Sequence, residues 1–185
     1  GVITDVGINA DTVAFMGDLS KAVGEKEIDA KGLAVSPGFI NMLSWAVESL
    51  IIDGKSQADI RQGVTLEVFG EGSSMGPMSD QMKADAKAEM ERRGIAPNIA
   101  SFVGATTARV HVLGYENRLP NAEEMERMKA LVRAAMEEGA LGVGSSLIYA
   151  PANYSSTEEL IELCKVAGEY GGMYITHMRS EGNGI

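Results

Sequence analysis

The spacing of hydrophobic positions changes near residue 36 of this chain. Before it, apolar residues come in short runs separated by Gly, Asp and Asn: Val2–Ile3, Val6–Ile8 and Val13–Phe15. Such runs between turn-forming residues predict strands of a small antiparallel sheet. Because two or three strands are not stable alone in water, this segment is expected to pack on another part of the protein or to belong to a sheet completed elsewhere.

After residue 36, apolar runs alternate with amphipathic segments, a pattern typical of βα units around a parallel sheet. The expected strands are Gly38–Leu43, Thr65–Phe69, Ile99–Val103, Leu141–Ser145 and Met173–His177. The expected helices are Gln57–Gln62, Asp80–Arg93, a helix that begins after Asn121 and ends at Gly139, and Ser156–Tyr170.

Two of these helices carry start signals. Asn121 with Glu124, and Ser156 with Glu159, have the three-residue spacing of a capping box. We therefore expect each of these acids to fold back onto the residue that caps its helix.

Five strands and four helices predict an α/β fold with roughly 30 residues for each βαβ repeat. A complete TIM-type (β/α)8 barrel takes about 250 residues, so the chain would be such a barrel present only through about strand five. An open doubly wound sheet of five strands is the alternative, and periodicity leaves both open. In either fold, ligands bind at the carboxyl ends of the strands.

Composition narrows the possible partners and the compartment. The formal net charge of −10 argues against a nucleic-acid surface, which needs clustered Lys and Arg. The single cysteine, Cys164, cannot form an internal disulfide. The sequence shows neither a leader pattern nor an apolar run of about 18 residues. These features predict a cytoplasmic protein with no nucleic-acid partner and no membrane contact.

Two side chains at expected strand ends are candidates for metal binding. His177 ends an apolar strand and is followed by Arg179 and Glu181, and a neutral imidazole there is a ready zinc ligand. A buried histidine satisfied by the backbone is the alternative. Glu71 lies between Gly70 and Gly72 after another strand, where it is either a ligand or a solvated acid in a glycine-rich turn.

Several segments together resemble one family, the D-aminoacylase and N-acyl-D-amino-acid deacylase branch of the amidohydrolase superfamily. The matching segments are residues 28–32, 35–40, 63–65, 136–142, 147–151 and 174–181, the last reading Tyr-Ile-Thr-His-Met-Arg-Ser-Glu. The resemblance implies a TIM barrel over residues 36–185. It also implies a small β-domain to which residues 1–35 contribute strands.

The resemblance further implies hydrolysis of the amide bond of an N-acyl-D-amino acid by zinc-activated water. By this resemblance, His177 is a zinc ligand. A second histidine ligand, and an aspartate that acts as general base, would lie beyond Ile185. Arg179, Arg109, Tyr149 and Ser146 are the candidates for holding the substrate, because the planar fork of Arg suits a carboxylate and the other two side chains can hydrogen-bond.

The chain departs from the family at two places that matter for metal binding. Family members carry two histidines at the end of strand one, where this sequence has Leu43 and Trp45. The family cysteine after strand two aligns with Gly72, so Glu71 is the expected substitute. Neither Leu nor Trp can coordinate zinc, and we therefore expect one zinc ion rather than two.

Two other functions are compatible with these residues. One is a catalytically silent amidohydrolase-like binding protein, which the two lost histidines would mark. The other is a hydrolase of a different amide, such as a cyclic ureide. In each case the open edges of a five-strand sheet predict that an oligomer partner or the remainder of the chain closes the barrel.

Overall fold

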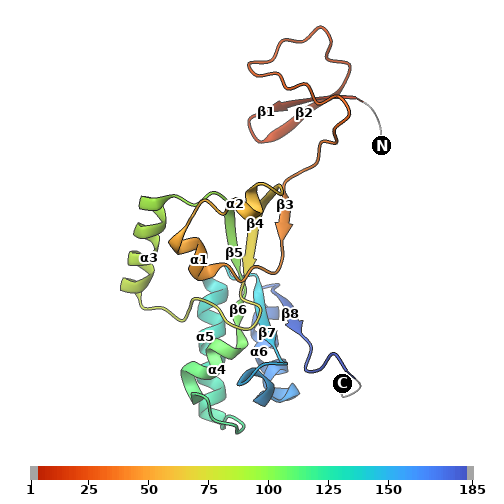
Figure 1. Cartoon of the computed structure of the whole chain (residues 1–185). Coiled ribbons are helices and arrows are strands. Elements are labelled where there is room, and N and C mark those ends of the chain that lie inside the picture. The colour runs from red at the N-terminus through yellow and green to blue at the C-terminus, as the bar shows by residue number, and fades with distance from the viewer. Residues whose placement is uncertain (1–3, 183–185) are drawn as a thin grey trace. The chain divides into compact units, whose positions relative to one another are not determined.

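The computed structural model describes residues 4–182, so the strand expected at Val2–Ile3 lies outside the described residues. The chain divides into two compact units, one up to Pro37 and one from Gly38 on. In the first, β1 (Asp5–Asn9) and β2 (Thr12–Gly17) form an antiparallel hairpin, as the sequence predicts (Figure 1). No residue from 4 to 37 is buried, so the hairpin has no core of its own.

The second unit alternates strands with helices (Figure 1). Its strands are β3 (Phe39–Asn41), β4 (Val64–Phe69), β5 (Asn98–Ser101), β6 (Val103–Gly104), β7 (Gly142–Ser146) and β8 (Met173–His177). Its α-helices are α1 (Val47–Ile52), α2 (Gln57–Ile60), α3 (Asp80–Arg93), α4 (Ala105–Leu113), α5 (Ala122–Glu137) and α6 (Thr157–Glu169), with a short 3-10 helix η1 (Ala152–Tyr154). None of the described helices is long and apolar enough to cross a membrane.

The order of the strands distinguishes between a (β/α)8 barrel and a doubly wound sheet, the two folds that the hydrophobic periodicity of the sequence leaves open. One parallel sheet has the order β3-β4-β5 and the next has the order β6-β7-β8, and only Phe102 lies between β5 and β6. Parallel strands therefore follow one another in chain order, as they do in a (β/α)8 barrel. A doubly wound sheet would instead reverse its order at a switch point, and no reversal occurs among the described strands.

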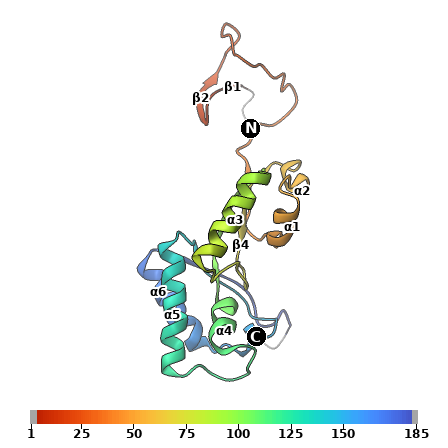
Figure 2. The same cartoon turned by 90° about the vertical axis from the view of Figure 1, so that its left-hand side faces the viewer.

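The helices after β6 and β7 bury one side of the second sheet. Figure 1 shows α4, α5 and α6 beside β6–β8, and Figure 2 shows the same three helices from a second side. The periodic apolar positions of α5 and α6 face this layer, where Met128, Val132, Leu163 and Val143 are at most 1% exposed. This packing fixes the second sheet, and with it the positions from which the segments after β6, β7 and β8 begin.

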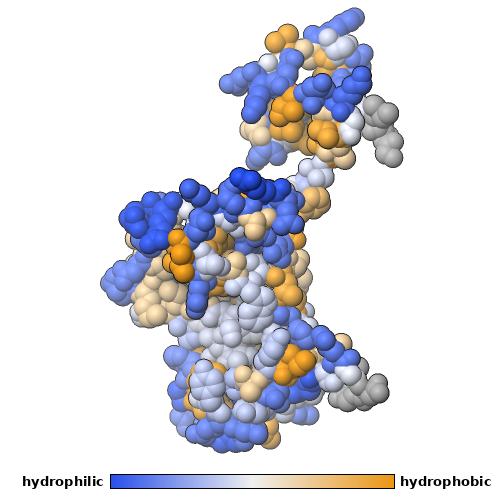
Figure 3. Space-filling view, viewed as in Figure 1, coloured by the Kyte–Doolittle hydropathy of each residue, from blue (hydrophilic) through white to orange (hydrophobic). Residues whose placement is uncertain are grey.

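The first sheet is open at its outer edge. β3 has a single strand neighbour, and its Phe39 and Ile40 are 56% and 55% exposed. Figure 3 shows hydrophobic surface at this edge of the unit. Unpaired edges with apolar surface are expected to be covered, so other residues of the whole protein should pack here.

Two helices differ from the sequence prediction. Arg109-Val110-His111-Val112, which looks like an alternating strand-like stretch, is part of α4, a helix that ends at Gly114 with φ +69°. Helix α1 was not predicted at all. The remaining expected helices and strands are present, with ends that agree or move by one or two residues, and the strand expected at Ile99–Val103 is divided into β5 and β6.

The capping predictions are confirmed at α5 and half wrong at α6. Asn121 and Glu124 form a reciprocal capping box at the start of α5. Ser156 accepts the Glu159 amide proton at the start of α6, but the Glu159 carboxylate does not fold back. It pairs with Arg109 instead, and it thereby supplies the counter-charge that the buried guanidinium needs.

The acid of the α5 capping box should titrate abnormally. The side-chain hydrogen bonds from Arg118 and the backbone bond from Asn121 lower the pKa of Glu124 from 4.5 to about 2. Its folded-state pKa lies below the unfolded value, so its stabilising effect is present above pH 4.5 and is lost as the pH falls towards 2.

We expect Arg118→Ala to return the pKa of Glu124 towards 4.5, measured by NMR titration of the carboxyl carbon. Lys165→Ala, which removes an exposed partner of Glu162, should leave the Glu124 titration unchanged. A Glu124 pKa near 4.5 in the unsubstituted protein would contradict this.

Candidate functional site

Three predicted site residues meet where β4, β7 and β8 end. Ser146 and His177 are register partners at the ends of β7 and β8. The Ser146 hydroxyl donates a 2.9 Å hydrogen bond to the Glu71 carbonyl and lies 3.3 Å from the Glu71 carboxylate. Glu71 and His177 thus flank Ser146 at the same edge, where ligands bind in parallel α/β folds.

Glycines allow the Glu71 loop to lie directly against the strands. A Cβ on Gly144 would come within 2.1 Å of the Gly70 carbonyl oxygen, and one on Gly70 within 2.1 Å of the Phe102 carbonyl oxygen. Gly70 also has φ +95°, which other residues rarely adopt. These close approaches explain why glycines surround Glu71 and alternate in β7: they hold the acid at a fixed place.

Gly144→Ala should therefore displace the Glu71 loop. We expect a loss of about 1–3 kcal/mol of stability, the cost of overpacking, together with weaker metal binding. Gly168→Ala is the matched control, since Gly168 lies in α6 with no atom within 4 Å of the added Cβ. It should be neutral or stabilising by about 0.5–1 kcal/mol. Thermal unfolding and metal analysis measure both effects, and equal behaviour of the two variants would contradict the packing argument.

The His177 ring is held on three sides. Its Nδ1 lies 3.3 Å from the Met178 carbonyl oxygen, and its Nε2 lies 3.2 Å from a Glu181 carboxylate oxygen. Tyr149 meets it edge to face, with ring centroids 5.9 Å apart. Both ring nitrogens therefore face oxygen atoms, and a metal ion at Nε2 would lie beside the Glu181 carboxylate.

These donors fit part of a metal shell. Within residues 4–182 there is no group of three or more His, Cys, Asp or Glu side chains placed to hold one ion. Leu43 and Trp45, after β3, offer no donor atom. The His177 imidazole and the Glu71 carboxylate are donor types that zinc accepts, and within residues 4–182 they belong to no group of three or more such side chains.

A pocket of about 700 Å³ opens beside these residues. It is lined by the segments that follow β3, β4 and β7 and by α4. Ser146 and Tyr149, two of the predicted substrate residues, line it. His177 and Glu71 lie next to it, through Tyr149 and Ser146 respectively.

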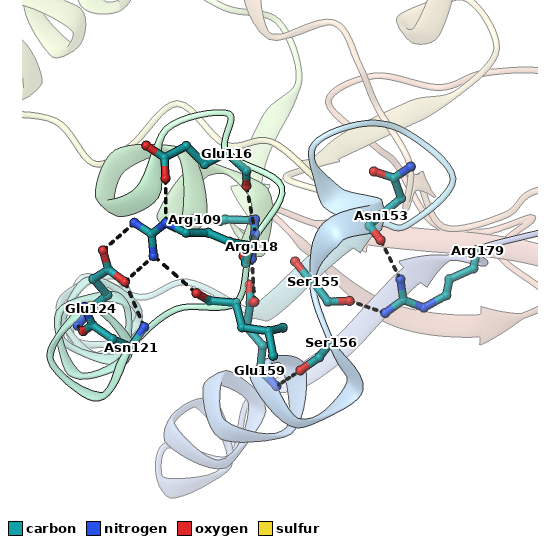
Figure 4. A network of polar contacts seen from close by, with 11 residues as sticks. Arg109, Glu116, Arg118, Asn121, Glu124, Asn153, Ser155, Ser156, Glu159 and Arg179 are labelled. Carbon is teal, nitrogen blue, oxygen red and sulfur yellow. Dashed lines mark hydrogen bonds and ion pairs between the residues drawn. The ribbon is translucent and has the colours of Figure 1, made fainter.

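Arg109 does not lie in the pocket, and its predicted role in binding substrate is corrected. It is 0% exposed, and its guanidinium donates to the Glu159 carboxylate at 2.6 Å (Figure 4). It also donates to the carbonyls of Glu116 and Arg118, 3.3 and 2.5 Å away. Arg109 therefore fixes the loop between α4 and α5 rather than reaching a ligand.

Arg179 has a similar role at the other loop. Its guanidinium donates to the carbonyls of Asn153 and Ser155 (Figure 4), which anchors η1 to the end of β8. The side chain remains exposed, but it does not line the pocket. Both arginines thus brace loops that carry pocket residues.

Sequence reasoning missed two residues that line the pocket, Trp45 and His111. Trp45 was considered only as a lost ligand. His111 lies on α4, a helix that is not among the elements expected from the sequence, and α4 carries it along the pocket. The signal that could have revealed α4 is Gly114, a typical residue just after the end of a helix.

The chain is similar to enzymes of known structure and name. No family model matches it. It is 34% identical to D-aminoacylase of Alcaligenes xylosoxydans xylosoxydans over 98% of its own length and 41% of that protein. The chain thus spans about two-fifths of the length of the curated relatives that it matches.

Solved structures agree with the sequence comparison. Two structures of D-aminoacylase superpose with TM-scores of 0.86 and 0.85 at 33% identity, covering 99% and 98% of this chain and 43% and 42% of theirs. One of these two structures concerns a binuclear metal centre, in which one metal activates D-aminoacylase and the second attenuates it. The N-acyl-D-glutamate deacylase of Bordetella bronchiseptica, solved with zinc and a phosphonate inhibitor, has a TM-score of 0.74 at 25% identity over 98% of this chain and 42% of that one. Over 98% of its length the chain is therefore similar to D-aminoacylase and to N-acyl-D-amino-acid deacylases, and it corresponds to about two-fifths of these enzymes.

Proposed function

We propose that the whole protein hydrolyses the amide bond of N-acyl-D-amino acids with one zinc ion, in a (β/α)8 barrel that residues beyond this chain complete. The observation that carries the proposal is the meeting of Glu71 and His177 around Ser146 at the strand ends, beside a pocket of about 700 Å³. A pocket of this size suits a small molecule.

Each residue of the site has a distinct task in this proposal. His177 and Glu71 hold the ion together with ligands outside residues 4–182. When bound, zinc acts as a Lewis acid and makes water a nucleophile near neutral pH. Tyr149 packs against His177 and lines the pocket, so it orients the imidazole and contacts the substrate. The Ser146 hydroxyl keeps the Glu71 loop in place.

One ion rather than two is supported by the end of β3. Its Leu43 and Trp45 are 49% and 61% exposed, and neither has an atom that binds zinc. A D-aminoacylase described by one-metal activation and second-metal attenuation is consistent with activity from a single ion.

The proposal is tested with the whole protein and a panel of N-acetyl-D- and N-acetyl-L-amino acids, with and without added zinc. We expect release of acetate from the D-compounds only, and loss of release after chelation. Absence of turnover with zinc bound would favour a catalytically silent relative. Turnover of a cyclic ureide but of no N-acyl-D-amino acid would assign a different amide.

A further inference from the structure

Arg179 connects the strand that ends at His177 to the loop that contains Tyr149. It lies two residues after His177. Its guanidinium donates hydrogen bonds to the carbonyl oxygens of Asn153, at 3.1 Å, and of Ser155, both in the segment between β7 and α6 (Figure 4). The planar fork of an arginine suits two acceptors in a fixed geometry. Arg179 therefore fastens this loop, residues 147–156, at two points.

Hydrogen bonds within the loop connect this attachment to Tyr149. The Asn153 amide donates to the Tyr149 carbonyl oxygen at 3.0 Å, and the Tyr149 amide donates to the Ser146 carbonyl oxygen at 3.1 Å. Ser155 is only 4% exposed in the described residues, and residues that pack here in the whole protein can only increase its burial. The loop is thus fixed to β7 at Ser146 and, through Arg179, to the segment after β8.

The Tyr149 ring meets the His177 ring edge to face, with 62° between the two ring planes. This is one of the arrangements that aromatic rings prefer. The contact limits how far the imidazole can tilt and turn. A metal ligand has to be held within about 0.5 Å of its productive position, which requires neighbours that are themselves locked in place. Tyr149 is such a neighbour only while its loop is fastened.

We propose that Arg179 is a positioning residue for His177. By holding residues 147–156 it keeps Tyr149 packed on the imidazole, so it acts on His177 through the loop. The effect on zinc binding rests on the proposed function, whereas the position of the Tyr149 ring does not. Loss of an outer partner of a metal ligand weakens metal binding by about 10- to 100-fold. Because Arg179 acts indirectly, we expect Arg179→Ala to raise the Kd for zinc by about tenfold, the lower end of this range.

Fluorine NMR of the metal-free whole protein, with meta-fluorotyrosine in place of tyrosine, follows the position of the Tyr149 ring. The signal of Tyr149 is the one that disappears in Tyr149→Phe. His177→Ala removes the neighbour of this ring, and Arg179→Ala removes the hold on its loop. We expect each of these two variants to move the Tyr149 signal towards its position in the unfolded protein.

Two further variants separate the fork of Arg179 from general effects. Arg179→Lys keeps a charged donor but loses the planar fork, so its shift of the Tyr149 signal should be smaller than that of Arg179→Ala. Arg93→Ala is the matched control, because Arg93 is also an exposed arginine that donates to a backbone carbonyl, that of Ile52 at 3.1 Å. Neither Arg93 nor Ile52 lines the pocket, and the Tyr149 signal should stay unchanged in Arg93→Ala.

The Kd for zinc, measured by competition with a chelating indicator, shows whether Arg179 acts through Tyr149. Tyr149→Ala should also raise this Kd. If both residues act by one route, Arg179→Ala should raise the Kd much less in the Tyr149→Ala background than in the unsubstituted protein. A general loss of stability would instead act equally in both backgrounds.

The outcomes distinguish this inference from the proposed function. An unmoved Tyr149 signal in Arg179→Ala, or effects on the zinc Kd that multiply in the double variant, would overturn the inference even in an active enzyme. If the whole protein binds no zinc, the proposed function fails and the fluorine signal decides alone. A shift in Arg179→Ala that Arg93→Ala lacks would then support the positioning role, and equal signals would overturn it.

Discussion

Arg109→Ala is expected to destabilise the protein by about 3–5 kcal/mol, because it leaves a charged partner buried and unpaired. Arg109 and Glu159 are 0% and 1% exposed as side chains, and their ion pair measures 2.6 Å. The substitution also removes the hydrogen bonds that Arg109 donates to the carbonyl oxygens of Glu116 and Arg118. Urea unfolding of the whole protein measures the loss.

A paired replacement tests the cause. In the double variant Arg109→Met with Glu159→Leu no charge stays buried. Its loss of stability should therefore be much smaller than that of Arg109→Ala. Lys165→Ala, which breaks the exposed pair with Glu162, should cost less than about 1 kcal/mol. If Arg109→Ala were as mild as Lys165→Ala, the buried pair would not have the structural role assigned to it.

His177→Ala is expected to lose bound zinc and to lower kcat/KM for an N-acyl-D-amino acid by more than about 100-fold. Loss of a residue that only hydrogen-bonds to a metal ligand costs up to about 100-fold, and loss of the ligand itself should cost more. His177 provides the imidazole at the end of β8, beside the Glu71 loop. In the metal-free protein stability should change little, since the side chain is 27% exposed.

His111→Ala is the matched control, because His111 is the other of the two histidines in the chain. It lines the pocket but lies on α4 and not at the end of a strand. Its zinc content should be unchanged, and any effect should appear in KM. Equal loss of zinc in both variants would contradict the assignment of His177.

The sequence predicted best where a local pattern and the packing agree. The apolar spacing of α5 and α6 is the same spacing that places Met128 and Leu163 in one buried cluster with Val143 of β7, so both helices could be predicted. α4 is short, has an apolar face interrupted by the buried Arg109, and looked strand-like for that reason.

Non-local contacts limited prediction of the site. That Glu71 and His177 meet at Ser146 depends on the order of the strands and on the close approach of Gly70 to Gly144, which no local pattern encodes. The partners of Arg109 are likewise 7 to 50 residues away in sequence. An arginine looks the same in a sequence whether it braces a loop or binds a carboxylate.

Titration of zinc into the metal-free whole protein, with activity followed at each addition, tests the one-metal site most directly. Because Leu43 and Trp45 provide no donors, we expect activity to rise with zinc and to reach its plateau at one equivalent per chain, with no rise in His177→Ala. A plateau at two equivalents, or full activity without metal, would contradict the account.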